Sequence, residues 1–315
     1  MTNQAGDLFT TDLPQAPAWV RFSAAVIRRL PAGRYRAMDI LPRPSSAFLM
    51  HMAEEVGGYP FHCDLRDTIS REVCFTGCYE PQVSALVRSI LRPGMSFVDV
   101  GANWGYFTLL AASLVGRSGR VLSLEPDPRL FSILQGNVSR GRLDYVTAMQ
   151  LAASHESGIV SLTGYTEDGG NFGISRITQR SEKEEGVFQV NSDSLDSILK
   201  LHGMLSVDLM KMDIEGGEVF AIAGLDESLS NRKIKRLILE LHPIQLAEHG
   251  STVSAITDKL QSAGYKGWTI DHSQIATRET AYQKQIKPNR LLRPFDSADL
   301  YDDWPHHLWL APGVE

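Results

Sequence analysis

A short segment that begins at residue 96 constrains the fold of this chain more than any other. Residues 96–100 (SFVDV) have the apolar character of a buried strand, and Gly101 follows directly. Apolar side chains then recur at helical spacing, at Phe107, Leu110, Ala111 and Leu114. A buried strand, a glycine turn and a helix in this order form the first unit of an α/β sheet, in which ligands bind beyond the carboxyl ends of the strands.

The alternation of strand and helix continues after this unit. Further strands are predicted over residues 120–125, 145–151, 207–213, 234–241 and, antiparallel to the others, 307–310. Helices are predicted over about 128–138 and from Val253 to a stop at Gly264. Because most of these strands are apolar on both faces, they indicate a parallel sheet that is covered by helices.

The first 95 residues have a different texture. Apolar side chains at helical spacing predict a first helix, at Trp19, Phe22, Val26 and Leu30. A second helix is predicted after Ser45, and residues 59–75 read as two short strands. Pro81 opens a helix that stops at Pro93-Gly94. We therefore predict an N-terminal helical and strand extension over residues 1–80 and a ligand-binding domain over residues 81–315.

Composition argues against several classes of protein. The 315 residues include 31 Lys and Arg against 37 Asp and Glu, a net charge of −6, which disfavours a nucleic-acid partner. No stretch reaches the ~18 consecutive apolar residues of a membrane-spanning helix, and the N-terminus lacks the features of a signal peptide. Three cysteines do not make a disulfide framework. We expect a cytoplasmic protein without a nucleic-acid or membrane partner, for which a homo-oligomer is compatible with the sequence.

The turn after the first strand indicates which ligand it holds. A dinucleotide-binding turn needs glycines two and five positions after Gly101, but these positions are Asn103 and Tyr106. No GxxxxGK[ST] phosphate loop is present either. Glu125 ends the next strand, where an acid is placed to accept both hydroxyls of an adenosine ribose. The pattern predicts a nucleoside with an amino-acid tail and no phosphate, namely S-adenosylmethionine.

Each residue of this predicted site has a role in binding S-adenosylmethionine. Gly101 and Gly105 allow the backbone to approach the ligand, and Asp99 stabilises the ligand's ammonium group directly or through water. Ala152 follows the third strand, at the same edge of the sheet, and is predicted to contact the adenine edge. The alternative is that Asp99 only caps the turn and the glycines only allow tight packing. The predicted cofactor-binding residues are Asp99, Gly101, Ala102, Asn103, Gly105, Glu125 and Ala152.

Three blocks of sequence also resemble the signatures of FkbM-type methyltransferases. They are residues 98–106 (VDVGANWGY), 125–128 (EPDP) and 211–218 (KMDIEGGE), with 194–196 (SLD) and 239–243 (LELHP) on either side of the third. The resemblance covers about residues 72–270. It implies a Rossmann-like class I methyltransferase fold, with a mostly parallel seven-stranded sheet and helices on both faces. It also implies S-adenosylmethionine as the methyl donor and, usually, O-methylation of sugars or natural products, without fixing the acceptor.

The third block and the strand after it supply the candidate catalytic residues. Methyl transfer to a hydroxyl requires the acceptor oxygen to be positioned and its proton to be removed. Asp213 ends one predicted strand and His242 the next, so both are predicted to be catalytic. His242-Pro243 equally reads as a structural turn. Glu218 has a simpler interpretation, as an acid that complements the dipole of a short helix.

A metal-assisted variant of this chemistry is not favoured. Asp213, Glu240 and His242 offer oxygen and imidazole ligands to a divalent ion that would lower the pKa of the acceptor hydroxyl. No spacing demands such an ion, and we assign no metal ligand. A second group of residues does not indicate a zinc site, because it lacks a CxxC element. The group consists of His62, Cys63, Cys74 and Cys78.

These observations predict an S-adenosylmethionine-dependent O-methyltransferase. We expect its acceptor to be a hydroxyl of a small natural product or sugar moiety, in secondary metabolism. Two alternatives stay open: N-methylation of an amine, which needs less base catalysis, and a cofactor-binding protein without activity. Residues 1–70 and 271–304 lie outside the resemblance, and acceptor recognition is expected there.

Overall fold

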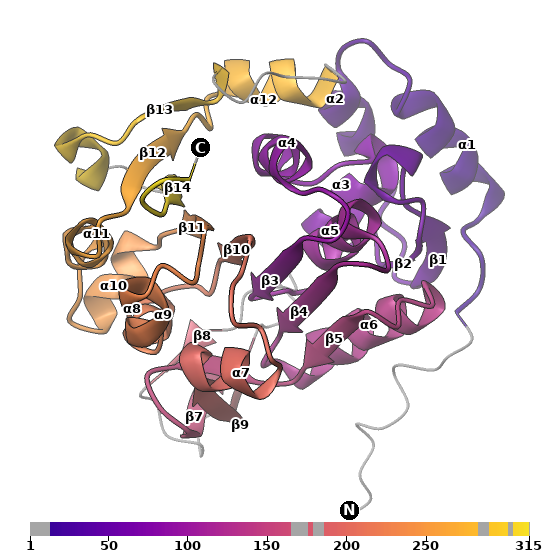
Figure 1. Ribbon diagram of the computed structural model, residues 1–315. Helices are drawn as coiled ribbons and strands as arrows, with labels where there is room; N and C mark the ends of the chain where they lie inside the picture. Colours follow the sequence, from indigo (N-terminus) through magenta and orange to yellow (C-terminus); the bar gives the residue numbers. More distant parts are fainter. Residues whose placement is uncertain (1–12, 165–175, 179–185, 283–289, 302–304, 315) are drawn as a thin grey trace, which may run out of the picture.

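An eight-stranded sheet forms the centre of the computed structural model, which describes residues 13–164, 176–178, 186–282, 290–301 and 305–314 (Figure 1). From edge to edge the strands are β13 (Leu292–Pro294), β12 (Lys266–Ile270), β14 (His306–Leu310), β11 (Arg236–Glu240), β10 (Leu209–Met212), β3 (Ser96–Val100), β4 (Arg120–Leu124) and β5 (Val146–Met149). Pairing is parallel from β11 to β5 and antiparallel on the other side, where β14 lies between β11 and β12. The predicted Rossmann-like α/β fold is confirmed.

The sheet has one strand more than the seven expected. The additional strand is β13, which pairs antiparallel with β12 through Trp268 and Pro294. It comes from residues 271–304, which lie outside the resemblance and for which no strand is predicted. A three-residue edge strand that contains a proline carries too few alternating side chains to be recognised in a sequence.

Helices cover both faces of the sheet, as predicted. Phe97 and Val121 point to one face, where they share a core with residues of α4, α5 and α6. Val98 and Leu122 point to the other face and pack with residues of α7, α8, α9 and α11. The helices are α4 (Pro81–Ile90), α5 (Tyr106–Val115), α6 (Pro128–Arg140), α7 (Leu195–Leu201), α8 (Glu218–Ala223), α9 (Asp226–Ser230), α10 (Pro243–Glu248) and α11 (Val253–Ser262).

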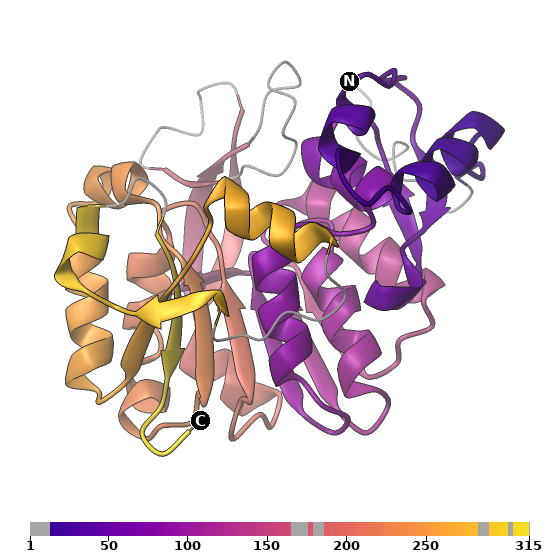
Figure 2. The same ribbon diagram turned by 90° about the horizontal axis from the view of Figure 1, so that it is seen from above.

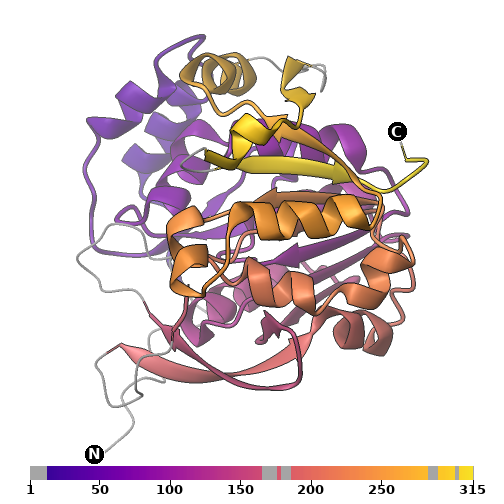
Figure 3. The same ribbon diagram turned by 90° about the vertical axis from the view of Figure 1, so that its left-hand side faces the viewer.

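A second, four-stranded sheet lies beside the main one, and Figure 3 shows its curved strands in pink. Its strands, in order, are β6 (Ala152–Ser154), β9 (Val187–Ser194), β7 (Gly158–Thr163) and β8 (Arg176–Ile177). In the sequence, residues 159–190 interrupt the alternation of strands and helices, and residues 165–171 read as a loop between shorter strands. The second sheet occupies this region, and the predicted loop lies outside the described residues. Because β6 directly follows β5, this sheet reaches the carboxyl-end edge of the main sheet.

The N-terminal segment is where the sequence predictions fail most. The first helix, α1 (Ala18–Ile27), is confirmed, but Val20, Ala24 and Ile27 form its buried face, whereas Phe22 is 72% exposed. The predicted helix after Ser45 is wrong. Residues there form β1 (Phe48–His51), which pairs antiparallel with β2 (Pro60–Cys63). Pairing between residues that are 9 to 15 positions apart therefore overrides the local helical spacing. Two short helices also lie here, α2 (Arg34–Asp39) and η2 (Glu54–Val56).

The second predicted strand of this segment is also wrong, because α3 (Thr68–Thr76) forms instead. Asp67 caps this helix, since its carboxylate accepts a hydrogen bond of 2.8 Å from the backbone N–H of Ser70. Seven of the nine helical residues are buried, among them the polar Ser70, Arg71 and Thr76, so the polarity of the sequence does not separate a buried face from an exposed one. The prediction mistook a capped, buried helix for a strand.

The C-terminal segment returns across the molecule to the N-terminal part. α12 (Gln274–Tyr282), shown in gold in Figure 2, packs against α4, and Gln82 donates a hydrogen bond of 2.6 Å to Thr277. A short helix, η5 (Ser297–Tyr301), follows β13. No helix in the described ranges is both long enough and apolar enough to cross a membrane.

Candidate active site

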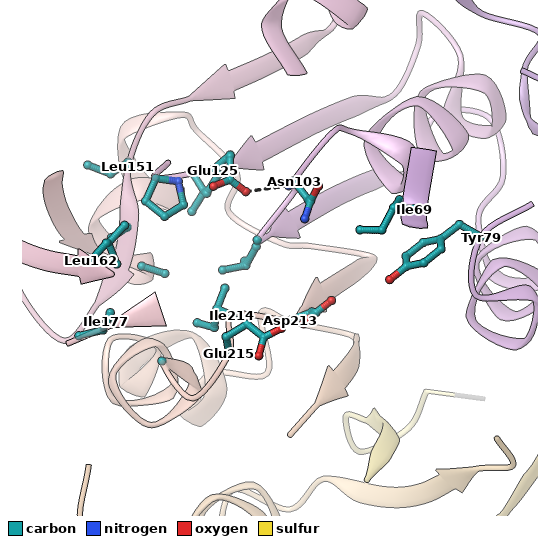
Figure 4. A pocket seen from close by; sticks show the side chains of 17 residues that line it. Ile69, Tyr79, Asn103, Glu125, Leu151, Leu162, Ile177, Asp213, Ile214 and Glu215 are labelled. Atoms are coloured by element: carbon teal, nitrogen blue, oxygen red, sulfur yellow. Dashed lines mark hydrogen bonds between the residues drawn. The ribbon is translucent and has the colours of Figure 1, made fainter. Parts of the chain in front are cut away.

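A pocket opens at the carboxyl ends of β3, β4 and β10 (Figure 4). About 770 Å³ of space, part of it open to solvent, lies between its lining residues. Of the predicted site residues, five line it: Gly101, Asn103, Glu125, Ala152 and Asp213. The crevice beyond the strand ends is where the first strand–turn–helix unit predicts a ligand, and the pocket lies there.

Gly101 is required by a close approach of two strand ends. Its φ is +83°, and a Cβ added to it would lie 1.9 Å from the backbone oxygen of Asp213. Backbone atoms cannot move aside as a flexible side chain does, so no larger residue fits. This contact joins the turn after β3 to the turn after β10, as in the alternative that the glycine allows tight packing, and the predicted approach of the backbone to the ligand stays a prediction. Gly105, with φ of +88°, begins α5 outside the lining of the pocket.

Glu125 joins the turn after β3 to the end of β4. Its carboxylate accepts hydrogen bonds from the backbone N–H of Asn103 at 2.7 Å and of Asp127 at 2.9 Å. Burial raises the pKa of Glu125 to about 8, although these two hydrogen bonds act in the opposite direction. A carboxyl group that lines a pocket in this way is suited to accept hydrogen bonds from ligand hydroxyls, as predicted for a ribose.

Asp99 does not line the pocket. It is 1% exposed, and its Oδ2 accepts a hydrogen bond of 2.7 Å from the Thr108 hydroxyl. Burial raises the pKa of Asp99 to about 6. Ala102 is buried as well and, like Gly105, is absent from the lining. The structure thus places Asp99, Ala102 and Gly105 under the turn, and their predicted contacts with the ligand stay predictions.

The opposite wall of the pocket comes from the second sheet. Leu151, Ala152 and Ala153 enter it where the chain passes from β5 to β6. Leu162 on β7 and Ile177 on β8 complete an apolar surface that Figure 4 shows facing Glu125 and Ile214. The sequence predicts Ala152 here. It gives no signal for Leu162 or Ile177, which lie in the interrupted region and come close to the strand ends only through the fold.

Acidic side chains gather at the end of β10. The Asp213 side chain is 23% exposed toward the pocket, and its Oδ2 accepts a hydrogen bond of 3.0 Å from the Lys211 ammonium group. Lys211 is 3% exposed and lies 4.7 Å from the centre of the Phe107 ring. Nearby carboxylates, Asp213 foremost, outweigh the effect of burial and hold the pKa of Lys211 above its ordinary value. A buried cation therefore holds the Asp213 carboxylate in place.

His242 lies behind these acids rather than in the pocket lining. Its Nδ1 is 2.9 Å from Glu218 Oε1, and its Nε2 is 3.5 Å from Glu215 Oε2 and 3.9 Å from Asp213 Oδ1. Burial lowers the pKa of His242, but the hydrogen bond and the charges of the carboxylates, Glu218 first, raise it to about 10. Glu218 is fully buried, so it does more than complement a helix dipole: it holds this histidine.

The same acids form two groups with donors that suit a divalent cation. In each group the ligand atoms lie within 4.8 Å of one another, in Asp213, Glu215 and His242 and in Glu80, Asp213 and Glu240. These carboxylates also have neighbours in the protein: Glu240 Oε2 lies 3.0 Å from His306 Nε2. Among the described residues, the cysteines form no such group, and all three are free thiols. The less favoured metal interpretation thus stays a prediction.

Two residues that line the pocket come from the N-terminal segment and were missed. Ile69 lies on α3, and Tyr79 lies between α3 and α4. Glu80, the next residue, has a φ of 40° and caps α4. No motif marks these positions, because their proximity to Asp213 depends on how α3 and α4 pack on the sheet. Only the pre-proline position of Glu80, a common helix start, offers a local signal.

A family model and several known proteins are similar to this chain. Residues 99–266 match the family model of the methyltransferase FkbM domain. The 31-O-demethyl-FK506 methyltransferase FkbM of Streptomyces tacrolimicus is 28% identical over 233 residues, which cover 61% of this chain and 83% of that protein. The 2-O-methyltransferase NoeI of Sinorhizobium fredii (strain NBRC 101917 / NGR234) is 26% identical over 188 residues, with coverages of 56% and 75%.

A solved structure resembles the chain more distantly. It is the crystal structure of a methyltransferase FkbM from Methylobacillus flagellatus KT, with 16% identity and a TM-score of 0.41. The similarity covers 76% of this chain and 54% of the crystallised one, so this chain spans about half of that protein. The family model, in contrast, spans more than half of this chain and includes the turn, Glu125 and Asp213. The chain therefore belongs to the FkbM methyltransferase family, enzymes that use S-adenosylmethionine as methyl donor.

Proposed function

We propose that this enzyme is an O-methyltransferase that methylates a hydroxyl of a small natural product or sugar moiety in secondary metabolism. The observation that carries the proposal is the Asp213 carboxylate, which lines the pocket and is held by a buried lysine. Alcohols do not ionise near neutral pH, so their methylation needs a group that accepts the proton. An amine needs this help less, which makes a fixed carboxylate at the reacting end more useful for a hydroxyl.

The pocket residues fit S-adenosylmethionine. The Glu125 carboxyl group would receive the ribose hydroxyls, and the apolar side chains of Leu151, Leu162 and Ile177 would cover the adenine. Asp213 and Glu215 supply negative charge in the same pocket, which favours a positively charged ligand. When bound, S-adenosylmethionine supplies a methyl group on a sulfonium centre that is open to in-line attack.

We assign the role of proton acceptor to Asp213. Its Oδ2 is engaged by Lys211, and the carboxylate is partly exposed to the pocket, where it can accept a hydrogen bond from the acceptor hydroxyl. Asp213 would take up the proton of the acceptor hydroxyl as its oxygen receives the methyl group, and S-adenosylhomocysteine would be the leaving group. His242 is less suited to this role, because a histidine with a pKa of about 10 already holds its proton at neutral pH. We propose that His242 keeps Asp213 and Glu215 in place.

The names of two relatives support the choice of oxygen as the methylated atom. One is a 31-O-demethyl-FK506 methyltransferase and the other a 2-O-methyltransferase. Each name describes transfer to an oxygen of its own substrate. Their identity to this chain, below 30%, does not transfer a particular acceptor, and so the proposal extends to the hydroxyl class alone.

The test is an acceptor screen with a variant at the proposed base. The enzyme is incubated with methyl-labelled S-adenosylmethionine and matched panels of hydroxylated and amino compounds, and mass spectrometry locates the added methyl group. Asp213→Asn should lower kcat on a hydroxyl acceptor by about 100-fold or more while the Kd for S-adenosylhomocysteine, which carries no sulfonium charge, changes little. Asp144→Asn is the matched control, because Asp144 pairs with Arg117 at the surface. Products methylated only on nitrogen, or full turnover by Asp213→Asn, would contradict the proposal.

A further inference from the structure

Two lining residues set the pocket of this enzyme apart from its family domain. The family model matches residues 99–266, and every other lining residue of the described pocket falls within that range. Ile69 and Tyr79 alone come from the segment before it. Figure 4 shows both on the side of the pocket that is away from Leu151 and Leu162 and close to Asp213. The shared domain therefore surrounds most of the pocket, while a segment outside it closes the acidic end.

Packing holds the Tyr79 ring rigidly. It meets the ring of Tyr106 edge-on, with centroids 6.0 Å apart and an interplanar angle of 83°, and lies 6.3 Å from the ring of Phe107. Its backbone oxygen accepts a hydrogen bond of 2.6 Å from the Ser84 hydroxyl, which is also 3.0 Å from the Tyr106 hydroxyl. These contacts tie Tyr79 to α4 and α5, so its hydroxyl has a fixed position.

The Tyr79 hydroxyl is available to a ligand. In the described part of the chain no protein group forms a hydrogen bond with it, and Figure 4 shows the oxygen directed toward Asp213. Burial raises the pKa of Tyr79 well above its ordinary value, and the charges of Glu80 and Asp213 raise it further. The group therefore stays a neutral phenol that can both donate and accept a hydrogen bond.

We propose that Tyr79 is a specificity-determining residue of the acceptor site, whose hydroxyl forms a hydrogen bond with the acceptor group that faces the transferred methyl. Ile69 supplies the apolar wall beside it. This inference rests on the proposed function, since it takes the Asp213 side of the pocket as the reacting end. It assigns acceptor recognition to the segment that joins α3 to α4, and it favours small acceptors that present an oxygen or nitrogen next to an apolar face.

The test uses two probes and needs no identified acceptor. Sinefungin is an analogue of S-adenosylmethionine with an amine in place of the sulfonium methyl group, whereas S-adenosylhomocysteine has no group at that position. Calorimetry gives the Kd of each probe for the wild type and for Tyr79→Phe, which keeps the ring and removes the hydroxyl. We expect Tyr79→Phe to weaken sinefungin binding about tenfold and to change the Kd of S-adenosylhomocysteine less than about twofold.

Tyr106→Phe provides the matched control. It removes a hydroxyl of the same aromatic cluster that is bonded to Ser84 and lies outside the pocket lining. We expect it to leave the ratio of the two dissociation constants unchanged. The inference is overturned if Tyr79→Phe binds both probes with the Kd values of the wild type. It is also overturned if both Kd values rise by the same factor, which would mean that the hydroxyl only shapes the cofactor site. An acceptor screen without methylated hydroxyls would overturn the proposed function while leaving this comparison valid.

Discussion

The Asp99 carboxylate is buried at the carboxyl end of β3 with only one of its oxygens engaged. Thr108 donates a hydrogen bond to Oδ2, whereas Oδ1 has no hydrogen-bond partner in the described part of the chain. Burial raises the pKa of this group from 3.8 to about 6, and the hydrogen bond and the charge of Lys211 offset only part of that effect. The folded protein thus favours the protonated form of Asp99, while the unfolded chain ionises near pH 4.

The sign of the pH effect follows from this difference. A group whose pKa is raised on folding contributes stability that is fully present below its unfolded pKa and is lost as pH rises through its folded pKa. Between pH 4 and pH 8 the loss from Asp99 amounts to about 2 kcal/mol. Asp99→Asn removes this loss of stability. In urea unfolding, the free energy of unfolding of the variant should therefore exceed that of the wild type by about this amount at pH 8 and equal it near pH 4. An equal difference at both pH values would show that burial of Asp99 is not the cause.

At the scale of elements, two ion pairs of similar geometry differ in burial, one at the end of β10 and one next to β11. The nitrogen–oxygen distances are 3.0 Å in Lys211–Asp213 and 2.7 Å in Lys235–Asp208. The Lys211 side chain is 4% exposed and that of Lys235 44%. Removal of a buried partner leaves an uncompensated charge and costs about 3–5 kcal/mol, whereas an exposed pair is worth about 1 kcal/mol or less.

We therefore expect Lys211→Met and Lys235→Met to differ sharply. Lys211→Met should lower the free energy of unfolding by several kcal/mol, because Asp213, Glu80 and Glu240 lose their common cation. Lys235→Met should lower it by about 1 kcal/mol or less. Denaturant unfolding of both variants at neutral pH measures the difference. Equal losses would contradict the view that burial, rather than distance, sets the strength of these pairs.

Elements with a complete local signal were predicted well from the sequence. The residues of β3 and the bounds of α4 agree with the prediction, because buried apolar runs and Pro81 mark them directly. The helix predicted around Phe48 was wrong because strand pairing with β2, not local spacing, decides the structure of this segment. Glu125 and Asp213 were placed in the pocket by their position at strand ends. Tyr79 was not predicted to lie in the pocket, because only the packing of α4 on the sheet brings it to that place.

For the whole molecule, the most informative feature is a core that crosses the predicted domain boundary at residue 80. One buried cluster includes Val20 of α1, Phe61 of β2 and Val73 of α3 together with Phe97 and Leu209 of the main sheet. The N-terminal segment also completes the pocket. A segment that buries its apolar side chains against the sheet gains most of its stability from that contact and has little reason to unfold on its own.

We therefore expect residues 13–91 and the family domain to unfold in one transition. Tryptophan fluorescence, to which Trp19 on α1 and buried Trp104 beside the pocket contribute, and far-UV circular dichroism should give the same midpoint in urea. S-adenosylhomocysteine should raise that midpoint for both probes together, because a ligand that binds only the folded state stabilises every part that unfolds with it. Two separate midpoints, with only the later one raised by the ligand, would instead show that the N-terminal segment is an independent domain, and the contacts of Tyr79 would then persist only while that domain stays folded.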